Sequence, residues 1–288
     1  MPASPAPVAQ PVIPQHDIVT RLRAAGCVFA EDEARLLISA AQTPADIEAM
    51  VLRRIAGLPL EHVLGWAEFC GLRIAVDAAV FVPRVRTEFM VHQATALAQA
   101  ADRGGDNARN VEQAGNGTPR QPVVVDICCG SGAVGAALAA ALGPVELYAA
   151  DIDPAAVSCA RRNVAAAGGQ VFEGDLFEPL PAALRGRVEI LLANTPYVPS
   201  GEIRLMPPEA RLHEPRVTLD GGADGLDIQR RVAAAAPGWL APGGHLLVET
   251  SARQAPTTVE IFARNGLAPR VVSSEELDAT VVIGTVPR

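Results

Sequence analysis

The chain has 288 residues, of which 49% are hydrophobic and 19% are charged, enough for one large and one small folded unit. Its net charge of −8 argues against a duplex-DNA-binding protein, because such proteins need a dense positive face to displace counterions from phosphates. The apolar runs are too short for a membrane span, and the five cysteines lack the spacing of a zinc site. Residues 1–15, rich in proline and alanine, predict a disordered tail without secretory features, so we expect a cytoplasmic protein.

The segment after this tail is predicted to be mostly helical. Residues 17–57 carry a helical pattern, in which Thr43 can cap a helix that a proline opens. Strand-like runs at residues 65–76 and 80–82 then predict a β-hairpin. We therefore assign residues 16–86 to an N-terminal helical domain with a hairpin.

A connection and a second domain follow. Residues 87–121 are predicted to be a connecting helix up to residue 101 and then a flexible, polar and glycine-rich linker over residues 102–121. In residues 122–288 strands alternate with helices, which predicts a parallel, doubly wound α/β sheet with helices on both faces. The expected strands are residues 123–127, 145–150, 170–173, 188–193, 245–249, 269–272 and 281–286, and the expected helices are residues 133–142, 154–166, 226–236 and 251–265.

A glycine-rich loop follows the first of these strands. Gly130, Gly132 and Gly135 spell G-x-G-x-x-G between a strand and a helix, where a ligand can approach the backbone and its amides. Asp151 ends the second strand, where a carboxylate can accept hydrogen bonds from ribose hydroxyls. The pair indicates a nucleoside cofactor without choosing between NAD and S-adenosylmethionine. The alternative is a tight turn with an acid near a helix start.

An Asn-Thr-Pro-Tyr step follows the strand at residues 188–193, whose carboxyl end faces the ligand crevice of such a sheet. The side-chain carbonyl of Asn194 and the backbone carbonyl of Thr195, which precedes Pro196, can each accept one hydrogen of an NH₂ group. Tyr197 can lie along a flat substrate. The step favours methyl transfer to nitrogen over hydride transfer. The alternative is an ordinary turn with a packed tyrosine.

A third candidate follows the strand at residues 170–173. Asp175 can accept a hydrogen bond from an adenine amino group, and Leu176 or Phe177 can pack near the base. A helix cap or loop acid is the alternative.

With these motifs together, the chain resembles the HemK/PrmC family of protein-glutamine N(5)-methyltransferases, from about Glu33 to the C-terminus. Beside the glycine loop and the Asn-x-Pro-Tyr step, the resemblance is carried by PLEHVLGWAEF at residues 59–69, FVPRVRTE at residues 81–88 and EPRVTLDGGADGL at residues 214–226. It implies a class I S-adenosylmethionine-dependent methyltransferase fold. It also implies methylation of the glutamine in the GGQ motif of peptide chain release factors.

The resemblance further implies roles for individual residues. The cofactor, S-adenosylmethionine, would be bound by Asp126, Cys128, Cys129, Gly130, Ser131, Gly132, Asp151, Asp175, Leu176 and Asn194. The target amide would be bound by the catalytic step of Asn194, Thr195, Pro196 and Tyr197. The N-terminal helices and the hairpin would help to recognise the protein substrate, and we expect a monomer.

The sequence departs from the family pattern in four places. Thr195 replaces a proline, Cys128 replaces the first glycine of the cofactor loop, and Arg86 replaces an acid. Thr250 and Ser251 replace the Ile-Gly that usually follows the glutamate of the fifth strand. A divergent relative that methylates another protein is therefore an alternative.

Three further alternatives stay open. A methyltransferase for nucleic-acid base amino groups uses the same acceptor logic on a flipped base, but the acidic charge and the lack of a basic recognition segment oppose it. An NAD-dependent oxidoreductase fits the glycine loop but leaves the Asn-Thr-Pro-Tyr step unexplained. A non-catalytic cofactor-binding protein is consistent with the departures.

Overall fold

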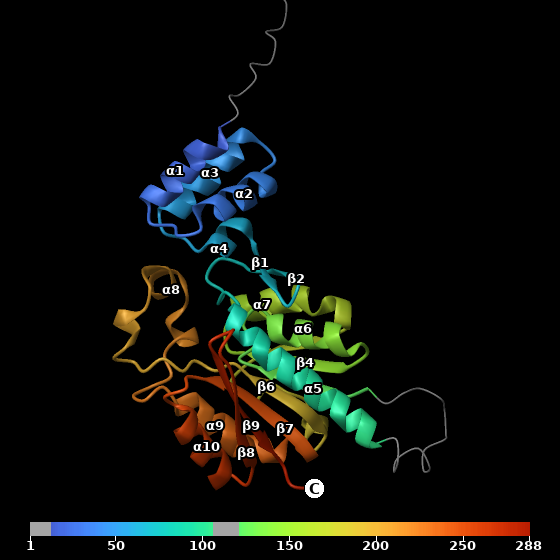
Figure 1. The fold of residues 1–288 in the computed structure, drawn as a ribbon. Coiled ribbons are helices and arrows are strands. Elements are labelled where there is room, and N and C mark those ends of the chain that lie inside the picture. Colours follow the sequence, from blue (N-terminus) through green and yellow to red (C-terminus); the bar gives the residue numbers. More distant parts are fainter. Residues whose placement is uncertain (1–12, 106–120) are drawn as a thin grey trace, which may run out of the picture.

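The computed structural model describes residues 13–105 and 121–288, which form a group of N-terminal helices beside a larger α/β domain (Figure 1). The N-terminal helices are α1 (Gln15–Ala24), α2 (Ala30–Ala40), α3 (Pro44–Ile55) and the short α4 (Leu60–Leu64). The hairpin strands β1 (Trp66–Phe69) and β2 (Leu72–Ala75) follow, and then the long helix α5 (Glu88–Gly105).

The N-terminal helices pack through their apolar faces. Helix α3 starts where the sequence predicts: Thr43 Oγ1 accepts from the Asp46 amide at 3.2 Å, and the Asp46 carboxylate accepts from the Thr43 amide at 2.8 Å. The buried faces of α1, α2 and α3 meet in an apolar cluster of their own. This cluster includes Ile18, Leu22, Ala34, Leu37, Ile47 and Val51.

The hairpin is shorter than predicted, and the expected strand at residues 80–82 is wrong. Strands β1 and β2 pair with each other, whereas residues 80–82 join no ladder. Their backbone groups bind side chains instead: His62 Nε2 lies 2.8 Å from the Val80 carbonyl oxygen, and the Val82 amide donates to Glu214 Oε1 at 3.3 Å. Because Val80 and Val82 are buried all the same, their apolar pattern resembled that of a strand.

The α/β domain is built on a seven-stranded sheet with the order β5-β4-β3-β6-β7-β9-β8. Its strands are β3 (Val123–Ile127), β4 (Glu146–Asp151), β5 (Gln170–Glu173), β6 (Val188–Ala193), β7 (Leu240–Thr250), β8 (Ala268–Ser274) and β9 (Ala279–Thr285). Strands β3 to β7 are parallel, as predicted, but β9 is antiparallel to both β7 and β8, so the predicted parallel pairing does not extend to this edge of the sheet. Only residues 275–278 join β8 to β9, and so short a connection requires an antiparallel pair.

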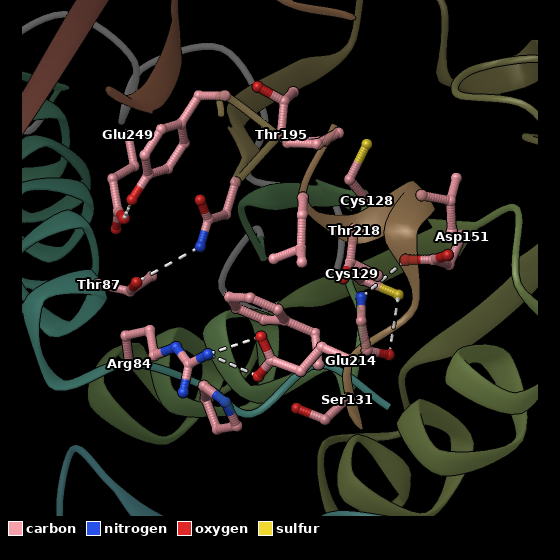
Figure 2. A pocket seen from close by; sticks show the side chains of 18 of the residues that line it. Arg84, Thr87, Cys128, Cys129, Ser131, Asp151, Thr195, Glu214, Thr218 and Glu249 are labelled. Atoms are coloured by element: carbon pink, nitrogen blue, oxygen red, sulfur yellow. Dashed lines mark hydrogen bonds and ion pairs between the residues drawn. The ribbon is translucent and has the colours of Figure 1, made fainter. Parts of the chain in front are cut away.

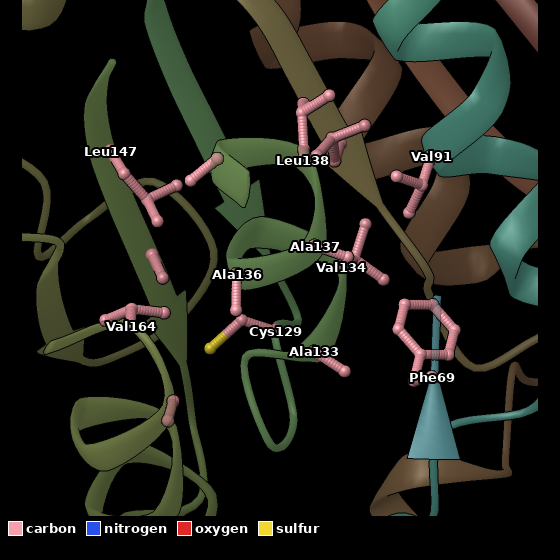
Figure 3. Packing of buried hydrophobic residues seen from close by; sticks show 14 of the residues in the cluster. Phe69, Val91, Cys129, Ala133, Val134, Ala136, Ala137, Leu138, Leu147 and Val164 are labelled. Atoms are coloured by element: carbon pink, nitrogen blue, oxygen red, sulfur yellow. The ribbon is translucent and has the colours of Figure 1, made fainter. Parts of the chain in front are cut away.

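Helices cover both faces of this sheet, as predicted. Helices α5, α6 (Ala133–Leu142) and α7 (Pro154–Asn163) pack with the hairpin on one face, and Figure 3 shows α6 there with Phe69 and Val91 close by. Helices α9 (Asp227–Ala235) and α10 (Ala255–Arg264) pack on the other face. Side chains alternate along β3, so that Val124 joins the first face while Val123 and Val125 join the second.

The two segments predicted to lack structure are only partly described. Helix α1 begins at Gln15 and Ile13 packs against the N-terminal cluster, while residues 1–12 lie outside the described residues. Helix α5 extends to residue 105, so the first residues of the expected linker are helical, and residues 106–120 also lie outside the described part. Within residues 13–105 and 121–288, no helix is both long enough and apolar enough to cross a membrane.

Candidate active site

A cavity of about 540 Å³ lies at the carboxyl ends of β3, β4, β6 and β7 (Figure 2). The strand order changes direction between β3 and β6, which is where doubly wound sheets bind ligands. The structure brings nearly all of the predicted site residues to this one wall. Those in the wall are Asp126, Cys128, Cys129, Gly130, Ser131, Asp151, Asp175, Leu176, Asn194, Thr195, Pro196 and Tyr197. Of the predicted set, Gly132 alone is not among the lining residues.

The glycine loop is tied directly to the acid at the end of the next strand. The Gly130 amide donates to Asp151 Oδ2 at 2.8 Å, and the Asp153 amide donates to Asp151 Oδ1 at 3.0 Å. Gly132 has a φ of +75°, and a Cβ there would lie 3.0 Å from the Cβ of Ala160 on α7. The loop therefore turns tightly against α7 and presents its outer side to the cavity.

Asp126 supports the same loop from the end of β3. It is 1% exposed, and its Oδ2 accepts from the Gly135 amide at 3.0 Å. Burial raises the pKa of Asp126 to about 7, the Gly135 hydrogen bond opposes this, and the nearby Asp151 charge adds to it. The carboxyl group thus links β3 to the start of α6.

The two adjacent cysteines form part of the cavity wall, and burial disfavours their thiolate forms. Cys128 has a φ of +55°, a left-handed conformation that favours glycine. Burial, followed by the charges of nearby acids, raises the pKa of both the Cys128 and the Cys129 thiol well above the ordinary value. Both side chains are therefore neutral thiols that pack rather than attack.

The third candidate segment, residues 175–177, lies partly in the cavity wall and partly in the hydrophobic core. Asp175 lines the cavity and forms an ion pair with Arg231 of α9 at 2.6 Å. Leu176 also lines the cavity, with a φ of +51°. Phe177 instead stacks on Trp239 in the core, at a centroid distance of 5.4 Å. Of the two apolar residues proposed to pack near an adenine, Leu176 and Phe177, the structure places only Leu176 in the cavity wall.

The Asn-Thr-Pro-Tyr step is held in place by Gln254 and by the glycine-rich segment of residues 221–225. Gln254 Nε2 donates to the carbonyl oxygens of Tyr197 and Asp224, both at 2.9 Å. Gly225 has a φ of +81°, and a Cβ there would collide with the Tyr197 carbonyl oxygen. The conspicuous glycines of residues 221–225 therefore allow two backbone segments to approach closely.

The side chains of the step contact two residues that sequence analysis did not place in the site. Asn194 Nδ2 donates to Thr87 Oγ1 at 3.4 Å, and the Tyr197 hydroxyl donates to Glu249 Oε1 at 3.2 Å (Figure 2). Thr195 is 1% exposed, and its hydroxyl has no hydrogen-bond partner among the described residues. Thr87 stands in the segment 81–88 that carried the family resemblance, and Glu249 is the family glutamate of the fifth strand, which were the available indications of their importance.

A partly buried ion pair, whose acid Glu214 sequence analysis did not place in the site, closes another side of the cavity. Arg84 Nη2 donates to both carboxylate oxygens of Glu214, at 2.6 and 2.7 Å, and the Glu214 side chain is 1% exposed. Burial raises the pKa of Glu214, whereas Arg84 and the Val82 amide lower it. The guanidinium of Arg84 also lies over the ring of Phe81, 4.9 Å from its centroid. Phe81 and Arg84 both line the cavity.

The N-terminal helices reach the cavity through a second ion-pair network. Arg54 of α3 binds Glu33 of α2 at 2.6 Å and also forms an ion pair with Glu209. Glu209 lies in α8 (Pro208–His213) and lines the cavity, as does Glu61 of α4. Helix α8 thus connects the N-terminal helices to the site.

The fold and the site decide between the cofactors that the glycine loop left open. Parallel sheets that bind dinucleotides share the glycine loop and an acid such as Asp151. They do not explain the antiparallel β9 or the side-chain amide of Asn194 at the end of β6. The chain is a class I S-adenosylmethionine-dependent methyltransferase.

Relatives by sequence narrow this class to one family. Residues 109–210 match the model of the methyltransferase small domain. Proteins named release factor glutamine methyltransferase from Geobacter sulfurreducens and Deinococcus radiodurans are 36% and 35% identical to the chain. These matches cover 82% and 85% of this chain and 75% and 82% of the relatives. The chain belongs to the family of release factor glutamine methyltransferases.

One relative of similar identity carries a different name. The 4-amino-L-phenylalanine/4-methylamino-L-phenylalanine methyltransferase of Streptomyces pristinaespiralis is 33% identical, over 75% of this chain and 69% of that protein. Its name specifies 4-amino-L-phenylalanine and 4-methylamino-L-phenylalanine as methyl acceptors.

Proposed function

We propose that the protein transfers a methyl group from S-adenosylmethionine to the side-chain amide nitrogen of the GGQ glutamine in peptide chain release factors. The observation that carries this proposal is the place of Asn194 and Thr195 in the wall of the cavity that the glycine loop also lines. The names of the curated relatives support the choice of substrate.

The cavity residues fit a nucleoside cofactor. Each carboxylate oxygen of Asp151 accepts one backbone amide, which leaves lone pairs for ribose hydroxyls. Leu176 offers an apolar contact for a base, and Asp175, paired with Arg231, lies where an amino group can be bound. The bound cofactor supplies an electrophilic methyl group.

The acceptor residues act by orientation and charge dispersal. An amide nitrogen is a poor nucleophile because its lone pair is delocalised into the carbonyl group. In this proposal Asn194 Oδ1 and the Thr195 carbonyl oxygen accept the two hydrogens of the target NH₂ and aim its lone pair at the methyl group. They also stabilise the positive charge that develops on nitrogen. The proton can leave after transfer, so no strong general base is needed.

The N-terminal helices are proposed to recognise the protein substrate. Arg54 anchors them to α8 at the cavity, so a protein bound to both can present a glutamine to Asn194. We also propose that the enzyme acts as a cytoplasmic monomer.

A second candidate is methyl transfer to the amino group of a free amino acid. It is favoured by Arg86, which lines the cavity and whose charge lowers the pKa of Glu249 without an ion pair at 4 Å or less within residues 13–105 and 121–288. Its guanidinium can bind a substrate carboxylate. The name of the Streptomyces pristinaespiralis relative supports this candidate.

The decisive experiment measures transfer of labelled methyl from S-adenosylmethionine to purified release factors. We expect label on the GGQ glutamine with wild-type enzyme, and turnover lower by one to three orders of magnitude for Asn194→Ala. Cofactor affinity, measured by calorimetry, should change much less. Labelling of 4-amino-L-phenylalanine but not of release factors would favour the second candidate, and equal loss of cofactor binding in Asn194→Ala would contradict the role of Asn194.

A further inference from the structure

We propose that Thr87 is a positioning residue that determines which end of the Asn194 amide faces the methyl acceptor, with Glu249 setting the direction of the Thr87 hydroxyl. Thr87 ends a short 3₁₀ turn (Val85–Thr87) and lies 107 positions before Asn194 in the chain. The inference rests on the proposed function, because it concerns a reaction that uses the Asn194 carbonyl oxygen.

The hydrogen bond from Asn194 Nδ2 to Thr87 Oγ1, 3.4 Å long, orients the amide. Thr87 is 2% exposed, so bulk water does not compete for this contact. A primary amide has two hydrogens at one end and an acceptor oxygen at the other. When Thr87 binds the NH₂ end, Oδ1 remains available to the substrate. An amide turned through 180° would present hydrogens to the substrate NH₂ and could not accept from it.

Thr87 alone does not impose this orientation, because a hydroxyl can both donate and accept. Glu249 removes the ambiguity. It lies near the end of β7 and is 2% exposed, its Oε2 is buried without a hydrogen-bond partner among the described residues, and the Thr87 side chain lowers its pKa. An ionised carboxylate can only accept, so in this proposal the Thr87 hydrogen turns toward the unpartnered Glu249 Oε2 and a lone pair remains for Asn194 Nδ2. The bonds then run in one direction, from Asn194 to Thr87 to Glu249.

The surroundings of Glu249 bear on its charge. Burial raises its pKa, while Thr87, Arg86, Tyr197 and Arg84 all lower it. The Tyr197 hydroxyl donates to Oε1, whereas Oε2 is buried and has no hydrogen-bond partner among the described residues, so it can receive the Thr87 hydrogen. Against the effect of burial, the two arginines and the Tyr197 hydroxyl favour the ionised carboxylate that this arrangement requires.

The kinetic test compares Thr87→Val, which has nearly the same shape without the hydroxyl, with Thr87→Ser, which keeps it. With release factor as substrate, we expect Thr87→Val to lower kcat about tenfold to hundredfold, since a misoriented acceptor misplaces the target nitrogen. KM and the Kd for S-adenosylmethionine should change little, and Thr87→Ser should restore most of kcat. Thr95→Val is the matched control, because within the described residues the Thr95 hydroxyl bonds only to the Val91 carbonyl oxygen of its own helix.

A second readout does not depend on the substrate. In protein labelled with ¹⁵N at asparagine, the Asn194 side-chain resonance is assigned by its loss in Asn194→Ala. We expect its NH₂ protons to exchange with water more slowly in wild type and Thr87→Ser than in Thr87→Val. Failure of wild type to methylate release factors would count against the proposed function, whereas the exchange comparison would still test Thr87.

Glu249→Gln extends the test if Thr87→Val does not fold. A glutamine can donate to Thr87, which frees the hydroxyl hydrogen to bind Asn194 Oδ1 and allows the amide to turn. We expect kcat to fall by a similar factor, with no recovery when Thr87→Ser is added. Unchanged kcat in both Thr87→Val and Glu249→Gln, or equal NH₂ exchange in wild type and Thr87→Val, would overturn the inference.

Discussion

The cofactor loop and the acceptor step lie in one cavity but are supported in different ways. Asp151, which binds the Gly130 amide, is only 21 positions away in the chain, within one strand–helix–strand unit. Asn194 instead bonds to Thr87, 107 positions away, and Tyr197 bonds to Gln254, 57 positions away. Substitutions that disturb Asp151 or the glycine loop should therefore affect cofactor affinity. Substitutions of the distant residues that hold the acceptor step should affect turnover instead.

The strongest test of this difference is Gly225→Ala. The methyl group would collide with the Tyr197 carbonyl oxygen at a positive φ, so the acceptor step must move. We expect kcat to fall about hundredfold or more, the effect of roughly 1 Å of misplacement, with a smaller change in cofactor Kd. Gly201→Ala is the control, since that glycine has open space around it. Wild-type kcat in Gly225→Ala would show that the glycine segment does not position the step.

Asp151→Asn should give the opposite result. It retains an acceptor for the Gly130 amide but removes the charge, and a hydrogen bond to a charged group is worth about 1.5–3 kcal/mol. We expect the Kd for S-adenosylmethionine to rise about tenfold to hundredfold, with kcat near wild type at saturating cofactor. Asp153→Asn, which alters only the cap of α7, should leave the Kd unchanged. A large loss of kcat in Asp151→Asn would remove the distinction between the two regions.

The pH dependence of stability tests the buried support of the cofactor loop. Since the pKa of Asp126 is raised to about 7 in the folded state, the folded protein binds its proton more tightly than the unfolded chain. Its contribution to stability is therefore lost as the pH rises from about 4 to 7. Relative to Asp126→Asn, the wild-type free energy of unfolding should fall by about 2 kcal/mol between roughly pH 5 and 7. Denaturant titrations without cofactor measure this, and parallel pH profiles would contradict the raised pKa.

The smallest expected effect is at the cysteines of the loop. Cys128→Gly removes side-chain strain at a positive φ but increases the freedom of the unfolded chain, so the free energy of unfolding should change by less than about 1 kcal/mol. Cys129→Gly should destabilise more, because Cys129 is buried without positive φ. Thermal unfolding of the two variants, compared at one pH, measures the difference. Equal destabilisation would show that the Cys128 conformation carries no strain.

The alternation of strands and helices, the glycine loop and Asp151 could all be predicted from the sequence. Each depends on contacts between residues close in the chain, so local patterns contain the necessary information. The Asn-Thr-Pro-Tyr step was also recognisable, because it directly follows a buried strand. Residues 80–82 misled the same analysis, since their burial is that of a strand while His62 and Glu214 satisfy their backbone groups.

Only the tertiary structure determined which residues support the acceptor step. Thr87, Glu249 and Gln254 come from three separate segments, and their polar side chains are equally compatible with exposed positions in the sequence. The antiparallel β9 was likewise decided by its place between β7 and β8. Sequence patterns record local geometry and burial, whereas the pairing of distant polar groups depends on the packing of the whole sheet.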